Sequence, residues 1–170
     1  MKLSKIGFAA AAVVLMAANY SIAIETKITE SISTGKKTVA SKFVELNPSS
    51  VEFKMPSDIK WVRNSAGTNE QAILFGDPSK PGPYVMRIKW LPGNFSKPHF
   101  HNSDRFFVVI SGTWWVGTGN KFNQDETVPI PAGSYVIHKG GQTHFDGARN
   151  EEAIIQVSGI GPVTTEQLHE

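Results

Sequence analysis

Three histidines lie at spacings that could place them around one metal ion. His99 and His101 are two residues apart in a segment rich in apolar and aromatic residues, so on an extended strand both imidazoles project from the same side. His144 follows later in the chain, after a short apolar segment and a glycine turn. Imidazole binds zinc, iron, nickel, manganese and copper to different degrees, and three imidazoles leave coordination positions open for substrate or water. The three imidazoles could therefore converge on one metal ion; the alternative is that they are surface or core histidines with hydrogen-bond partners.

Polar residues near these histidines are candidates for further roles. His138 and Asp104 are the candidates for a fourth metal ligand, although a strand-end histidine is the plainer interpretation of His138. Arg105 and Tyr135 are the candidates for catalytic groups. The guanidinium of Arg105 stays charged and forms a planar fork suited to carboxylate or phosphate. We expect Arg105 to pair with Asp104 or another acid and to point outward, because a buried cation beside a metal is costly; the alternative is that it faces the cavity and receives an anionic substrate.

Short apolar segments separated by Gly and Pro must position these residues, and they predict an all-β sandwich or barrel. The expected strands are residues 59–63, 71–75, 84–91, 106–110, 112–119, 133–138 and 152–160. Within residues 84–91, the side chains of Met86, Ile88 and Trp90 share one face, which we expect to line the barrel. Residues 106–110 are apolar at every position, which predicts a strand buried on both faces.

The chain of 170 residues is long enough for one domain with its own core. Residues 1–23 are typical of a signal peptide, with a basic start, an apolar stretch at 6–18 and a small-residue cleavage site ending at Ala23. That apolar stretch is shorter than the roughly 20 residues of a spanning helix, so no membrane anchor is expected after cleavage. We therefore expect a periplasmic or secreted protein with an N-terminal arm at 24–42 and a barrel domain at 43–165.

Charge and cysteine content exclude several classes of function. The chain has 17 Lys and Arg against 15 Asp and Glu, and removal of Lys2 and Lys5 with the signal peptide leaves 15 of each. There is no dense basic stripe, so no nucleic-acid partner is expected. The chain has no cysteine, which excludes disulfide bonds and thiolate chemistry.

Two segments resemble the two signature motifs of the cupin superfamily. The first motif is a glycine, five residues, His-x-His, three or four residues, a glutamate, six residues and a glycine, and its matches are Gly93, His99, His101 and Gly112. The second motif is a glycine, five residues, Pro-x-Gly, two residues and a histidine, and its matches are Gly133, Gly141 and His144. Lys139 stands at the proline, Ala148 at a frequent final asparagine, and Arg105 or Phe106 at the glutamate. Neither residue at the glutamate position can ligate a metal.

The resemblance is to small single-domain bacterial cupins, in a branch where an Asp-Arg pair such as Asp104-Arg105 stands in the glutamate region. It implies a jelly-roll β-barrel with an N-terminal extension, a homodimer, and one divalent metal (zinc, iron, manganese or nickel) held by His99, His101 and His144. It also implies a small-molecule enzyme of dioxygenase, isomerase or lyase type, or else a non-catalytic protein that binds a small ligand, sugar or metal. The resemblance is specific for fold and not for reaction, because one fold hosts many chemistries.

Overall fold

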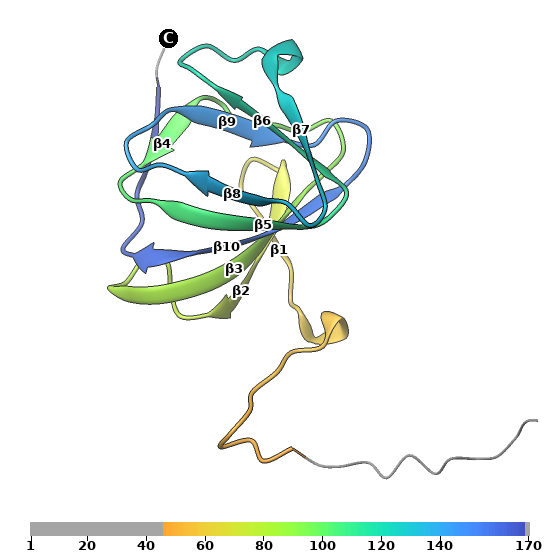
Figure 1. Ribbon diagram of the computed structural model, residues 1–170, viewed down its shortest axis with the longest axis vertical. Coiled ribbons are helices and arrows are strands. Elements are labelled where there is room, and N and C mark those ends of the chain that lie inside the picture. The colour runs from red at the N-terminus through yellow and green to blue at the C-terminus, as the bar shows by residue number, and fades with distance from the viewer. Residues whose placement is uncertain (1–45, 169–170) are drawn as a thin grey trace, which may run out of the picture. The chain divides into compact units, whose positions relative to one another are not determined.

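Two antiparallel sheets contain almost all of the regular secondary structure in the computed structural model, which describes residues 46–168 (Figure 1). The first sheet has the order β1-β2-β3-β10-β5-β8 and the second the order β11-β4-β9-β6-β7. The strands of the first sheet are β1 (Val62–Arg63), β2 (Asn69–Phe75), β3 (Gly82–Trp90), β10 (Ala153–Gly161), β5 (Arg105–Ser111) and β8 (Tyr135–His138). Those of the second are β11 (Thr165–Gln167), β4 (His99–His101), β9 (His144–Gly147), β6 (Thr113–Thr118) and β7 (Val128–Pro131). This architecture confirms the predicted all-β jelly-roll barrel.

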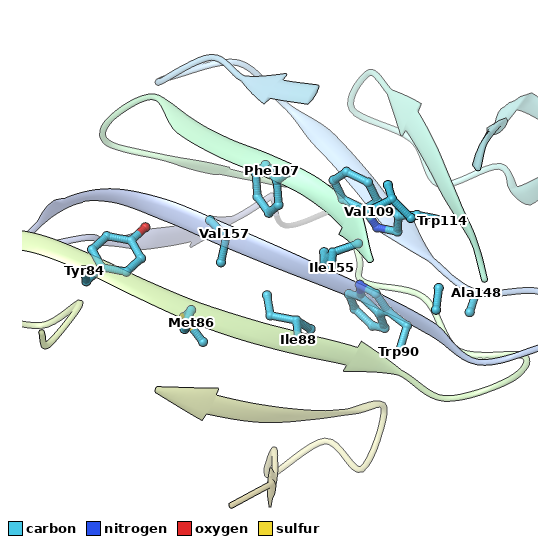
Figure 2. Packing of buried hydrophobic residues seen from close by; sticks show 11 residues of the cluster. Tyr84, Met86, Ile88, Trp90, Phe107, Val109, Trp114, Ala148, Ile155 and Val157 are labelled. Atoms are coloured by element: carbon cyan, nitrogen blue, oxygen red, sulfur yellow. The ribbon is translucent and has the colours of Figure 1, made fainter. Parts of the chain in front are cut away.

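The core lies between the sheets and is built on alternate residues of the long strands. β10 pairs with β3 on one side and β5 on the other, and its Ile155 and Val157 are fully buried. Met86, Ile88 and Trp90 of β3 are buried beside them, which confirms the face that the alternating pattern predicted. Figure 2 shows these side chains with Phe107, Val109 and, from the second sheet, Trp114. The site described below sits at one end of this packed layer.

β5 corrects one expectation, because it is not buried on both faces. Phe107 and Val109 are buried, whereas Phe106, Val108 and Ile110 are 38%, 40% and 42% exposed. The exposed side chains lie on the outer face of the sheet. The neighbouring strand β8 adds further exposed apolar side chains to the same face. Since both faces of β5 are apolar, composition alone could not separate the inner from the outer residues.

Glycine turns hold the two motif segments in place. Gly112, between β5 and β6, has φ +69° and packs so closely on the start of β10 that a Cβ atom would overlap the Glu152 carbonyl oxygen. Gly141 has φ +72° in the turn before β9, and its N–H donates to the carbonyl of His101 at 2.7 Å. This bond ties the turn that precedes His144 to the strand that carries the other two histidines.

The predicted signal peptide at 1–23 and arm at 24–42 lie outside the described residues. In the segment 46–51, the carbonyl of Asn47 accepts the N–H groups of Ser50 and Val51 and closes a turn. The strand-rich part contains two short 3-10 helices, η1 (Pro56–Asp58) and η2 (Gln124–Glu126). Within residues 46–168, no helix has the length and apolar character needed to cross a membrane.

Candidate metal centre

Neighbouring strands of the second sheet bring His99, His101 and His144 together. His99 and His101 lie two residues apart on β4, and His99 is the register partner of His144 on β9. All three are buried, and one ring nitrogen from each lies within 4.8 Å of the other two. Because metal–nitrogen bonds measure about 2.1 Å, small rotations of the rings suffice to close this cluster on one ion.

Backbone carbonyls fix the orientation of each imidazole. The Nδ1 atoms of His99, His101 and His144 lie 2.8, 3.0 and 3.0 Å from the carbonyl oxygens of Lys97, Thr164 and Gln142. A carbonyl oxygen only accepts, so Nδ1 carries the proton in each ring and Nε2 keeps its lone pair. Metal-ligating histidines are held in the same way by their outer hydrogen bonds. The donor set therefore fits a divalent metal ion.

The protonation states of these histidines also favour metal binding. Burial lowers the pKa of His101 to about 3, and the positive charge of Arg105 acts in the same direction. Burial lowers the pKa of His144 as well, although the negative charge of Asp146 opposes this shift. Both imidazoles are therefore neutral at ordinary pH, the state in which a histidine can ligate a metal.

Arg105 faces inward, contrary to the expectation that it pairs with Asp104 and points to solvent. It is 9% exposed, and its terminal nitrogen donates to Nε2 of His101 at 2.5 Å. Asp104 is instead occupied by the Gly140 N–H at 2.8 Å and by Nζ of Lys139 at 3.1 Å. β5 begins at Arg105, and side chains alternate along the strand, so Arg105 points inward as Phe107 and Val109 do.

His138 is a fourth histidine in the same cavity, but it is not part of the three-histidine group. Its ring is 7% exposed, packs against Phe107 and Trp114, and lies 3.9 Å from the His144 ring between centroids. Neither ring nitrogen has a hydrogen-bond partner among the described residues, and burial lowers the pKa of His138. Tyr135, on the same strand, is 62% exposed and does not line the cavity.

The sequence analysis did not single out Asp146, which is buried beside the histidines. Its Oδ2 accepts from the indole N–H groups of Trp90 at 3.1 Å and Trp114 at 2.8 Å, and its Oδ1 accepts from the Ser96 hydroxyl at 3.2 Å. Asp146 and His144 are two residues apart on β9 and therefore share one side of the strand. That spacing is the signal from which the residue could have been found.

We expect Asp146→Leu to destabilise the fold by about 2 to 4 kcal/mol, because two buried indole N–H groups lose their acceptor. Asp146→Asn keeps an acceptor oxygen of the same shape, so its expected loss is about 1 kcal/mol. Urea unfolding followed by circular dichroism measures both values. Equal stability of the two variants would show that the indole hydrogen bonds contribute nothing measurable.

A cavity of about 660 Å³ between the sheets contains the site. It is lined by the four histidines, Arg105 and Asp146, by the apolar side chains of Tyr84, Met86, Ile88, Trp90, Phe95, Phe107 and Val163, and by polar residues that include Asn64, Thr68, Asn69, Gln71, Ser96, Lys97 and Gln167. Its volume is in the usual range for a small-molecule site. The mixture of apolar walls and a few polar groups is also typical of such sites.

Comparison with solved structures identifies the fold. The polyketide cyclase RemF from Streptomyces resistomycificus is 18% identical with a TM-score of 0.56, and the match covers 71% of this chain and 88% of that one. A Ralstonia eutropha protein of unknown function with a cupin-like fold is 22% identical (TM-score 0.54; coverage 68% and 75%). A sugar phosphate isomerase of the cupin superfamily from Silicibacter pomeroyi is 17% identical (TM-score 0.54; coverage 67% and 80%).

These similarities show that the chain has the cupin fold, in agreement with the motif resemblance. No family model matches the sequence, and no curated protein matches it. At these identities the likeness defines the fold alone, and function must be argued from the site itself.

Proposed function

We propose that this protein binds one divalent metal ion through His99, His101 and His144 and is an enzyme acting on a small molecule. The observation that carries the proposal is the buried cluster of three histidines, in which a backbone carbonyl holds each Nδ1 and so leaves Nε2 as the ligand atom of each ring. Three protein ligands leave coordination positions open, as catalytic rather than structural metal sites do. The adjoining cavity supplies room for a substrate.

A metal held there would supply Lewis-acid polarisation of a carbonyl or enolate oxygen, or redox chemistry with dioxygen. The chain itself would hold the ion, orient the substrate and limit access of water through the apolar walls of the cavity. Among the dioxygenase, isomerase and lyase types, we favour the non-redox types. The fold neighbours named as a cyclase and an isomerase support this choice, and so does the predicted export, because ferrous iron is readily oxidised by air.

The second candidate is a non-catalytic protein that binds a small ligand without a metal. The hydrogen bond from Arg105 to Nε2 of His101 favours it, because the guanidinium uses the lone pair that a metal would need. In this case the guanidinium takes the place of the ion as the positive charge of the site.

Metal analysis of the purified full-length chain, expressed with zinc, manganese, nickel and iron supplied, separates the two candidates. The proposal predicts about one ion per chain by mass spectrometry of the elements, and an anomalous peak between His99, His101 and His144 at the absorption edge of that metal. Less than a few tenths of an ion per chain would contradict the metal enzyme and support the metal-independent binder.

A further inference from the structure

The positive charge of Arg105 is buried without an acidic partner. None of the salt bridges within residues 46–168 involves it, because Asp104 is paired with Lys139. Its described hydrogen-bond partner is the neutral imidazole of His101, and its Nε has none. A buried charge without a partner of opposite sign costs several kcal/mol, so an anion bound at Arg105 would remove a substantial penalty.

His138 adds a second unsatisfied group beside Arg105. The two residues are register partners in the pairing of β5 with β8, at the end of the first sheet that faces the three histidines. Both are more than nine-tenths buried, both line the cavity, and neither His138 nitrogen has a partner among the described residues. A neutral imidazole donates one hydrogen bond. The two side chains can therefore offer several convergent donors to one bound group.

The other charges of the cavity agree with an anionic occupant. Lys97 and Arg105 are the basic residues of the lining, and Asp146 is the acidic one. The carboxylate of Asp146 already accepts three hydrogen bonds, from two indoles and a hydroxyl. A divalent metal on the histidines would make the interior still more positive.

We infer that the substrate of this cavity is a small organic carboxylate, bound by Arg105 with His138 as the second hydrogen-bonding group. The inference rests on the proposed function, because it names the substrate class of the same site. A single guanidinium matches a planar carboxylate in charge and in geometry. The Arg105 guanidinium lies 5.1 Å from the centroid of the Phe107 ring, which forms part of the same cavity wall. A phosphate dianion carries a second negative charge, which this one guanidinium does not neutralise.

Calorimetric titration of the full-length protein with acetate, succinate and benzoate tests the inference, with benzamide as the neutral analogue of benzoate and inorganic phosphate as the competing anion. The titrations are made on metal-loaded protein and on protein stripped with a chelator. We expect at least one carboxylate to bind, and we expect benzamide to bind at least about tenfold more weakly than benzoate if benzoate is that ligand.

Variants assign the binding to Arg105. Arg105→Gln is expected to weaken carboxylate binding by at least about tenfold, since hydrogen bonds to charged groups are among the strongest. His138→Phe, which keeps an aromatic ring against Trp114, is expected to weaken it several-fold. The matched control is Arg87→Gln, which removes an arginine that contacts Gln156 and does not line the cavity, and it should bind as the unaltered protein does.

Three results would each overturn the inference: no carboxylate binds the folded protein, Arg105→Gln binds as tightly as the Arg87→Gln control, or phosphate binds more tightly than every carboxylate. Circular dichroism serves to check that each variant is folded. Failure of the proposed function is separate, because it appears as missing metal in the elemental analysis. Binding that depends on Arg105 in the stripped protein would then identify a carboxylate binder without a metal.

Discussion

Alanine at His144 is expected to reduce bound metal from about one ion per chain to almost none. The substitution removes one of the three proposed ligands, and the remaining pair on β4 cannot close the cluster. Loss of an outer hydrogen bond to a metal ligand already costs about 10- to 100-fold in metal affinity, so loss of the ligand itself should exceed the upper value. Elemental analysis and competition with a metal-binding dye measure the change.

The matched control is His138→Ala, because His138 is an equally buried histidine in the same cavity and lies outside the ligand group. It should retain the ion within a few-fold of the original affinity. If His138→Ala also loses the metal, His138 is a fourth ligand and the three-histidine description is incomplete. If His144→Ala keeps the metal, the ion binds elsewhere and the proposed function is wrong. Thermal unfolding of both variants tests whether loss of metal is caused by a loss of the folded structure.

Arg105→Glu should raise metal affinity on the order of 100-fold or more. It frees Nε2 of His101, removes a positive charge next to the ion, and introduces a carboxylate that can ligate. Two unit charges about 4 Å apart interact by about 4 kcal/mol near a protein surface, and each 1.4 kcal/mol is a tenfold change in affinity. Titration against a competing chelator measures the affinity of both proteins.

Arg105→Gln separates the contributions, because it removes the charge without adding a ligand. Its metal affinity should fall between those of the original protein and Arg105→Glu, while its affinity for carboxylates decreases. Opposite effects of one substitution on cation and anion binding are difficult to explain by general damage to the fold. Unchanged metal affinity in both variants would show that Arg105 does not compete for the histidine cluster.

The sequence predicted most of the strands, although not β7, β9 or β11, and the three-histidine cluster was predicted with the help of the motif resemblance. Apolar segments of strand length, punctuated by glycine and proline, predicted the all-β architecture, and two-residue spacing placed His99 and His101 on one side of β4. The direction of Arg105 was not predictable in this way. A shift of the β5 register by one residue would exchange the inward and outward directions of the Asp104 and Arg105 side chains.

Other features of the site depend on contacts that are distant in the chain. Asp146 acquires its role from Trp90 and Trp114, which are 56 and 32 residues away, and no local pattern reports such contacts. The outer face of β5 was misjudged for a related reason. Its Val108 is apolar but lies opposite the exposed Tyr135 of β8, and only the register of the two strands reveals the outward direction.

Trp114 is a natural fluorescence probe in the interior of this barrel. Its indole stacks on His138 and donates to Asp146, and Trp90 donates to the same carboxylate. Indole emission responds to hydrogen bonding and to nearby charge. An ion or an anion that binds between the sheets adds charge close to both indoles, so we expect the intrinsic fluorescence of the protein to report on the occupancy of its cavity.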